Sequence, residues 1–337
     1  MKRRILIIVF IISVSLKLYS CDLCGCYMGI TPYDNHSSIG MYYHYRAFNG
    51  YNSTSTSGDL FPDGHLRNAN QSNTVNHHDG SVPAYSNSDY EIYRTAELRA
   101  KYFLHQRIEL NAVIPYRFNS QSMSDVVQKV SGIGDVNLFA GYHLIRKIEV
   151  DNVQQRLIIG AGIKLPSGSF NETSNDARAD ALIQPGTGTS DGFVYATYLL
   201  GIRKFGLSVN GTYKMNGTNS LHEHIENSTT GNASLFYKIP FLHERCFIIP
   251  KVNAYYEYSE GLFVYNEYIS GSAMNVMMLG PALDLFYKNL ELNLSAELPV
   301  YEKQETNAMK NSGRISLGVI YNFKQPKYLF KKSNSKN

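Results

Sequence analysis

The chain has 337 residues, 18% of them charged, and a formal net charge of +4. The charged fraction is below the roughly 25% of ordinary soluble domains. Most of the small basic excess lies at the two ends of the chain, so we expect no nucleic-acid partner. Tyr is abundant at 26 copies and Trp is absent, so Tyr must supply the interfacial aromatics if the chain meets a membrane.

The first twenty residues have the pattern of an export signal. Three basic residues at 2–4 precede an apolar run over 5–16, and small Ser20 stands just before Cys21. That run is too short to span a bilayer, and no later segment has about 18 consecutive apolar residues. We therefore predict a signal peptide over 1–20 and an exported protein without a transmembrane helix.

A Cys-rich segment is predicted over 21–37, on the periplasmic side. It carries Cys21, Cys24 and Cys26 in a C-x-x-C-x-C pattern, and the fourth thiol, Cys246, lies far along the chain. Three states of these thiols stay open. Disulfides among Cys21, Cys24, Cys26 and Cys246 suit an oxidising compartment. Thiolates also suit copper or zinc, with the loop imidazoles His77 and His78 as further ligand candidates. Acylation of Cys21 would make a lipid anchor.

Twelve segments alternate apolar and polar residues with a period of two, as strands with two unlike faces do. In the eleventh, for example, Leu292 and Leu294 alternate with Glu291 and Asn293. Several of the segments have the length of about 9–11 residues that a tilted strand needs to cross a bilayer. The predicted strands are 39–49, 90–104, 107–118, 136–144, 156–165, 193–202, 207–214, 231–237, 248–258, 277–287, 290–300 and 314–323.

The connections between these strands alternate in length. Long polar loops such as 51–89 and 166–190 follow odd-numbered strands, and tight turns such as 105–106, 204–205 and 288–289 follow most even-numbered ones. Long loops at one end and short turns at the other are typical of bacterial outer-membrane barrels. A soluble sandwich, the alternative for alternating strands, has no reason to sort its loops in this way.

The predicted fold is therefore all-β, a transmembrane antiparallel up-and-down β-barrel of about twelve strands over 38–323, with a basic tail over 324–337. An even strand count leaves both chain ends on the periplasmic side. The expected location is the outer membrane of a Gram-negative cell, and the expected partners are outer-membrane lipids and the barrel-assembly machinery.

The inward face of the barrel carries charges of both signs, which support two functions. The first is a porin-like or transporter-like path for a small, unidentified solute, with the charges tuning selectivity. The second is a non-conducting structural or surface barrel that anchors partners, with a self-neutralising interior. The lumen-facing candidates are His44, Arg46, Glu97, Arg99, Lys101, Glu109, Arg117, Asp135, Lys164, Lys251, Glu257, Asp284, Glu291 and Glu297.

No catalytic signature is present in the sequence. The serines of 166–169 belong to a turn and not to a strand-turn-helix nucleophile elbow. His143 falls on the inward face, so it is not placed for a lipid-side Ser-His pair. We therefore expect no enzyme.

Three motif pieces from residue 132 to 202 resemble a known family. GIGD precedes a strand, KLPSG ends the next one, and QPGTGTSD precedes the third. In this order they resemble outer-membrane barrels of the MetA-pathway phenol-degradation family, a transporter-like group. The N-terminal CDLCGC with its following segment resembles a Bacteroidetes-type branch of these barrels. The resemblance implies a transporter-like barrel, related in architecture to fatty-acid and toluene channels. The predicted twelve strands depart from the fourteen usual in fatty-acid channels, which argues against a gate for a hydrophobic ligand.

Overall fold

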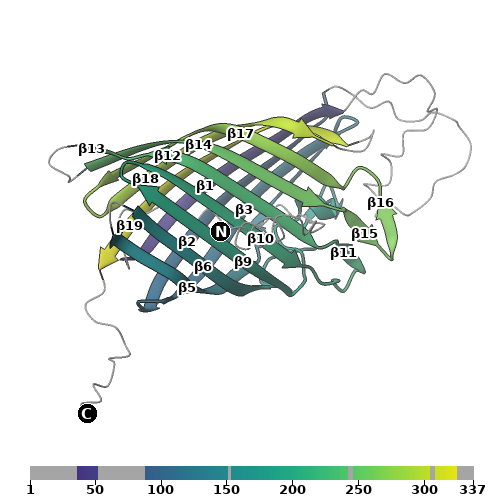
Figure 1. Cartoon of the computed structure of the whole chain (residues 1–337). Coiled ribbons are helices and arrows are strands. Elements are labelled where there is room, and N and C mark those ends of the chain that lie inside the picture. The colour runs from purple at the N-terminus through teal and green to yellow at the C-terminus, as the bar shows by residue number, and fades with distance from the viewer. Residues whose placement is uncertain (1–35, 52–87, 151–152, 242–245, 304–307, 325–337) are drawn as a thin grey trace, which may run out of the picture.

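The computed structural model describes residues 36–51, 88–150, 153–241, 246–303 and 308–324. Their main feature is a closed barrel of twelve antiparallel strands (Figure 1). The first strand pairs with the last, and the two middle strands β12 and β14 also pair, so the sheet has no free edge. The barrel strands are β1 (His36–Tyr51), β2 (Tyr90–His105), β3 (Ile108–Met123), β5 (Val136–Val150), β6 (Val153–Leu165), β9 (Asp191–Ile202), β10 (Phe205–Met215), β12 (Ser228–Tyr237), β14 (Cys246–Ser259), β17 (Met274–Tyr287), β18 (Leu290–Glu302) and β19 (Met309–Lys324).

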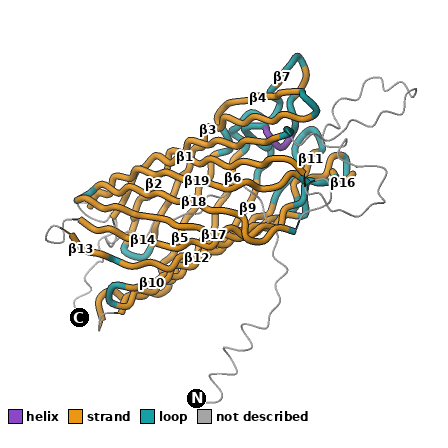
Figure 2. Tube along the Cα trace, turned by 90° about the horizontal axis from the view of Figure 1, so that it is seen from above, coloured by secondary structure: helices purple, strands orange, loops and turns teal. Residues whose placement is uncertain are grey.

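The predicted twelve-stranded up-and-down barrel is confirmed. Each of the twelve predicted segments coincides with one barrel strand to within a few residues. The short turns lie at one end of the barrel and the long loops at the other, as predicted, and these are called the turn end and the loop end (Figures 1 and 2). Two of the tight turns centre on Arg203 and Lys288, whose φ angles of 56° and 52° are left-handed. These turns lie within one residue of the predicted positions.

Shorter elements that the sequence did not reveal lie mostly at the loop end. Strand β4 (Val126–Ile133) pairs with the final half of β3 and extends that hairpin past the barrel (Figure 2). The others are β7 (Thr173–Ser174), β8 (Ala177–Arg178), the 3-10 helix η2 (Ala181–Ile183), β11 (Glu223–Ile225), β13 (Ile239–Phe241), β15 (Leu262–Val264) and β16 (Glu267–Ile269). Strands β7 and β8 pair within one loop, β11 pairs with β15 of another loop, β15 pairs with β16, and β13 extends the sheet at the turn end.

The two faces of the barrel wall are the inverse of those of a soluble sheet. On β18, outward Leu294 and Leu298 are 40% and 64% exposed, whereas inward Glu291 and Glu297 are 3% and 1% exposed. A sandwich would bury the leucines and expose the carboxylates. A closed wall with apolar side chains outside satisfies every strand hydrogen bond within the sheet, which a lipid environment demands.

Outward aromatic side chains lie toward both ends of the wall. Such girdles mark the two membrane interfaces of outer-membrane barrels. Phe takes part as well as Tyr, so Tyr does not fill this role alone. Among the described residues no helix is long and apolar enough to cross a membrane. Among the exposed aromatics are Tyr102, Phe205, Tyr287 and Tyr321 near the turn end, and Tyr116, Phe118 and Tyr301 toward the loop end.

Candidate functional site

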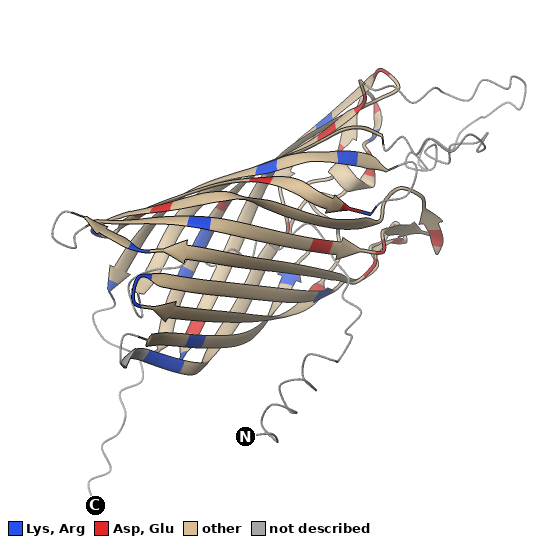
Figure 3. Ribbon diagram, turned by 45° about the horizontal axis from the view of Figure 1, so that its top comes forward, with Lys and Arg blue, Asp and Glu red and all other residues tan. Residues whose placement is uncertain are grey.

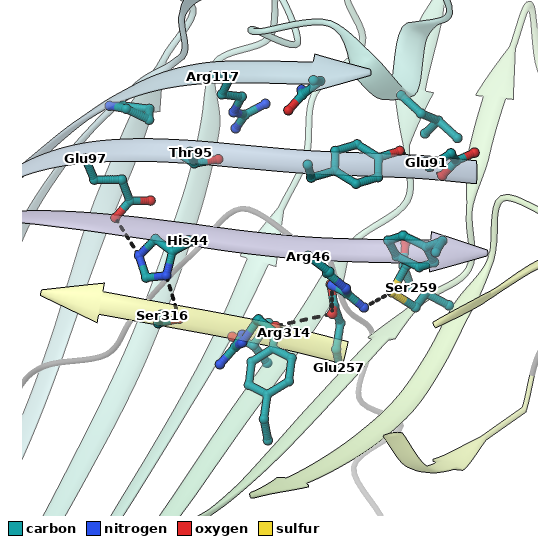
Figure 4. Close-up of a pocket in the computed structure, with 18 of the residues that line it drawn as sticks. His44, Arg46, Glu91, Thr95, Glu97, Arg117, Glu257, Ser259, Arg314 and Ser316 are labelled. Carbon is teal, nitrogen blue, oxygen red and sulfur yellow. Dashed lines mark hydrogen bonds and ion pairs between the residues drawn. The ribbon is translucent and has the colours of Figure 1, made fainter. Parts of the chain in front are cut away.

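A cavity of about 220 Å³ lies inside the barrel. Strands β1, β2, β3, β14, β18 and β19 form much of its wall, and residues from the loops that follow β6 and β14 line its loop-end side. Figure 4 shows how its charged side chains point into it from several strands. The charged residues that line it are His44, Arg46, Glu91, Glu97, Arg117, Glu257, Glu297 and Arg314.

The structure places the predicted lumen-facing side chains among buried polar groups of the barrel interior. His44, Arg99 and Lys101 are partly exposed. The other eleven are buried: Arg46, Glu97, Glu109, Arg117, Asp135, Lys164, Lys251, Glu257, Asp284, Glu291 and Glu297. Buried charges are tolerated only when they are paired and hydrogen-bonded, so their partners decide what the interior can do.

Arg46 of β1 forms an ion pair that crosses the lumen. Its Nη1 donates to Glu257 Oε2 at 2.7 Å, although β19, β18 and β17 separate β1 from β14 in the sheet. Arg46 Nε and Nη2 both donate to Asn311 Oδ1, at 3.1 and 2.9 Å. Tyr255 donates its hydroxyl to the same Glu257 oxygen at 3.3 Å. The pair therefore spans part of the lumen and ties together two strands that are not neighbours in the sheet (Figure 4).

A second pair lines the same cavity on neighbouring strands. Arg314 of β19 donates Nε to Glu297 Oε2 of β18 at 2.9 Å, and its Nη2 lies 2.8 Å from the same oxygen. The Arg314 guanidinium carbon lies 3.8 Å from the centre of the Tyr255 ring. Asn253 donates to the other Glu297 oxygen at 3.2 Å. Stacking and a shared carboxylate hold this guanidinium in one orientation against the wall.

His44 and Arg99 share the Glu97 carboxylate, nearer the turn end than Arg46. Arg99 Nη2 lies 2.5 Å from Glu97 Oε2, and His44 Nε2 lies 3.5 Å from the same atom. His44 Nδ1 lies 2.8 Å from Ser316 Oγ, and the Arg99 guanidinium is 4.2 Å from the centre of the Tyr42 ring. Carboxylates thus partner the cations here as well.

Toward the turn end, smaller polar groups fill the interior. Lys251 of β14 donates to Asp284 of β17 at 2.7 Å. Asn293 of β18 donates to both Asp284 and Glu291, at 2.8 and 2.9 Å. The amide therefore bridges two carboxylates that would otherwise repel each other. This network crosses three consecutive strands and leaves little free volume on that side.

A His-carboxylate pair lies in the turn-end half of the interior on the opposite wall. His143 Nε2 of β5 lies 3.1 Å from Glu109 Oε2 of β3, and both side chains are buried. Asn111 donates to the other Glu109 oxygen at 3.3 Å. The Lys101 ammonium lies 5.8 Å from the centre of the Phe103 ring, which itself contacts the imidazole.

At the loop end, the three motif pieces meet in one buried ion cluster, formed by Asp135, Lys164, Asp191 and Lys214. Lys164 Nζ lies 3.1 Å from Asp135 Oδ2 and 2.5 Å from Asp191 Oδ2. Lys214 Nζ lies 3.0 Å from Asp191 Oδ2. All four side chains are at most 3% exposed. Two lysines face two aspartates, so the ion cluster is electrically balanced.

The ion cluster holds residues 166–190, here called the covering loop, across the mouth. The backbone N–H groups of Gly168 and Thr187 donate to Asp135, at 3.0 and 2.9 Å. The loop backbone passes so close that a Cβ on Gly186 would lie 2.5 Å from the Gly168 carbonyl carbon. Only glycine fits this approach, which explains the glycines of KLPSG and QPGTG.

The covering loop also reaches the interior wall and a second loop. Asn119 of β3 donates to the carbonyl oxygen of Ile183, whose side chain is fully buried. Arg178 forms a two-pronged ion pair with Glu223 at 2.6 and 2.9 Å. Asn219 donates to the Thr187 carbonyl oxygen at 3.0 Å. The covering loop is thus bound to β3, to the loop that follows β10 and to the ion cluster.

Several residues of the site were absent from the predicted set. Lys214 and Arg314 alternate with outward apolar residues such as Tyr213 and Ile315, so the period-two pattern contained their signal. Asp191 belongs to the QPGTGTSD motif, but its place in the ion cluster depends on a contact with Lys164 that forms only in the folded barrel. Arg178 and Glu223 lie in predicted loops, where no periodicity exists to find them.

The predicted metal and disulfide candidates fall mostly outside the described residues. Cys21, Cys24, Cys26, His77 and His78 lie there. Cys246 begins β14 at the turn end, is partly exposed, and has no disulfide partner among the described residues. Across the described ranges, no three His, Cys, Asp or Glu side chains are grouped so that they could hold a metal ion.

Comparison with known proteins supports the architecture. No family model and no curated protein matches this sequence. Among solved structures, an outer membrane channel from Pseudomonas putida F1 has a TM-score of 0.62 and 14% identity, covering 90% of this chain and 100% of its own. The β domain of the Bordetella autotransporter BrkA has a TM-score of 0.47 and 10% identity, covering 86% and 100%. At 14% identity, the likeness to the Pseudomonas channel concerns the fold, which is that of an outer-membrane barrel.

Proposed function

We propose that this protein is an outer-membrane channel that passes a small polar solute through its charged lumen. The observation that carries the proposal is the interior cavity of about 220 Å³, lined by charged groups of both signs. A small barrel that passes nothing can fill its whole interior with side chains, whereas this one keeps an open volume. The fold shared with the Pseudomonas putida channel adds support, as does the motif resemblance to the transporter-like MetA-pathway family.

The proposed orientation follows from the unequal ends of the barrel. In outer-membrane barrels the short turns face the periplasm and the long loops face outward. The described strands begin at His36 and finish at Lys324, both at the turn end. On this basis the signal peptide delivers the chain to the periplasm, and both the Cys-rich segment and the basic tail remain there.

The charge balance of the lining favours a polar solute without a large net charge. Three guanidinium groups and four carboxylates surround the cavity, with His44 beside Glu97. A strongly charged solute would have to break these pairs without replacing both partners, which is costly in a low-dielectric interior. A small neutral or zwitterionic solute can exchange hydrogen bonds with Arg, Glu, Thr and Asn while the ion pairs persist.

A non-conducting barrel is the second candidate function, and specific contacts favour it. Arg46 and Glu257 bridge two strands that are not neighbours in the sheet, and the covering loop crosses the mouth. A barrel whose charges only neutralise one another would anchor partners through its loops instead of passing solute. In either case the interior acts by binding or passage and not by catalysis.

Planar-bilayer recording and liposome swelling separate the two candidates. The mature chain is refolded into detergent, checked for heat-modifiable gel migration, and inserted into bilayers and liposomes. A channel gives discrete conductance steps, and swelling rates decrease as the size of neutral sugars or amino acids increases. Absence of both signals, in the wild type and in a variant whose covering loop has been released, would support the non-conducting barrel.

A further inference from the structure

The outer surface of the barrel has a groove toward the loop end. It has a volume of about 390 Å³ and lies where β1, β2, β3 and β4 adjoin. Tyr43 and Phe118 line it with exposed aromatic side chains, and Arg94, Lys129 and Ser131 add polar groups. The groove therefore combines an apolar floor with two cations on the lipid-facing side of the wall.

The two cations differ from those of the interior because they lack anionic partners. Arg94 Nε donates to the Phe118 carbonyl oxygen at 3.3 Å. Within the described ranges, neither the terminal Arg94 nitrogens nor Lys129 Nζ contacts a carboxylate. Arg94 also interrupts an otherwise apolar outward row on β2 that contains Ile92, Ala96 and Leu98.

The groove lies at the level of the aromatic girdle. Phe118 packs against Tyr116, with ring centroids 4.8 Å apart, and both rings are exposed outward. Such rings mark the headgroup region of the membrane. An outward cation is strongly unfavourable at the bilayer midplane but nearly neutral at this level. Arg94 and Lys129 are thus at the depth of lipid phosphates.

We propose that this groove binds a phosphate-bearing lipid of the outer leaflet. Arg94 and Lys129 contact the phosphates, and acyl chains lie along Tyr43 and Phe118. A guanidinium suits phosphate because it can offer two parallel N–H donors, and a lysine adds a point charge. The assignment to the outer leaflet rests on the proposed orientation of the barrel, with its loop end outside.

Native mass spectrometry of the refolded full-length mature protein tests this binding. Diphosphorylated lipid A is titrated against its dephosphorylated form. The wild type should bind the phosphorylated lipid preferentially. Arg94→Gln and Lys129→Gln should each weaken binding about 5-fold, and the double variant about 25-fold, because near-surface Lys and Arg contribute comparable electrostatic increments. Arg94→Lys should recover part of the loss.

A double variant, Lys310→Gln with Lys204→Gln, is the matched control. It removes two exposed lysines outside the groove and should leave lipid binding unchanged. Equal losses in both double variants would show a general charge effect and overturn the proposal. Equal affinity for the dephosphorylated lipid would also overturn the proposal. So would displacement of the lipid by millimolar inorganic phosphate, if the protein showed no preference for the phosphorylated lipid. Conductance of the groove variants is recorded separately, so failure of the channel proposal remains distinguishable.

Discussion

Replacing Lys164 with Met should release the covering loop. Lys164 is 1% exposed, and its ammonium contacts the carboxylates of Asp135 and Asp191 and the hydroxyl of Thr189. Met keeps most of the side-chain volume but removes the charge. Two buried carboxylates then share Lys214 as the remaining cation of the ion cluster.

The magnitude follows from the loss of one partner of a buried ion pair, which costs about 3–5 kcal/mol. Each 1.4 kcal/mol corresponds to a tenfold change in an equilibrium constant. The closed state of the covering loop should therefore lose about two to four orders of magnitude in its equilibrium constant. The barrel strands should persist, because their hydrogen bonds do not depend on Lys164.

Trypsin cleavage and conductance measure this release. Arg178 lies within the covering loop, where its ion pair with Glu223 and its low exposure protect it. In Lys164→Met, cleavage after Arg178 should become much faster and the mean conductance should rise. Lys310→Met, which removes an exposed lysine at the same end, serves as the control. Unchanged cleavage would refute the role of the ion cluster, and faster cleavage without a rise in conductance would refute the covering loop as a barrier.

Three other experiments test separate parts of the molecule. Leu294→Arg should reduce folding yield far more than Ser295→Arg, because an outward Arg costs about 2–4 kcal/mol near the midplane; equal yields would contradict the assigned faces. Glu297→Gln removes the carboxylate partner of Arg314, so the reversal potential in a salt gradient should shift toward anion preference; a shift toward cations would contradict the lumen assignment. Intact mass should show the loss of four protons for two disulfides, whereas an added acyl mass or four free thiols with bound copper or zinc would favour the other states of Cys21, Cys24, Cys26 and Cys246.

The strands could be predicted because the face of each residue is local information. Alternation in 290–300 alone separates Leu294, which is exposed, from Glu297, which is buried. Loop lengths then order the strands, and closure follows from the need to satisfy backbone groups in lipid. Extension of β3 by β4 beyond the barrel was missed, since a hairpin outside the membrane is not required by any of these constraints.

Ion pairing inside the barrel could not be predicted from the sequence. Arg46 and Glu257 are 211 residues apart and lie on strands that are not neighbours. Which inward residues meet across the lumen depends on strand tilt and stagger, which are set by closure of the whole sheet. The period-two pattern gives only the inward face, so it supplies the candidates and leaves their partners undetermined.

The motif pieces illustrate how a local signal can reflect a distant contact. A Cβ on Gly168 would lie 2.8 Å from both the Gly134 carbonyl carbon and the Gly186 Cα, so all three pieces contribute a glycine to one packed backbone crossing. Asp135 then accepts N–H groups from two of the pieces it does not belong to. The motif therefore specifies the conformation of the covering loop more than it specifies the membrane strands. The ion cluster beside it is electrically balanced, so the cluster itself adds no net charge at the mouth. If the proposed channel function holds, we therefore expect the Arg and Glu side chains of the cavity to set the selectivity among solutes.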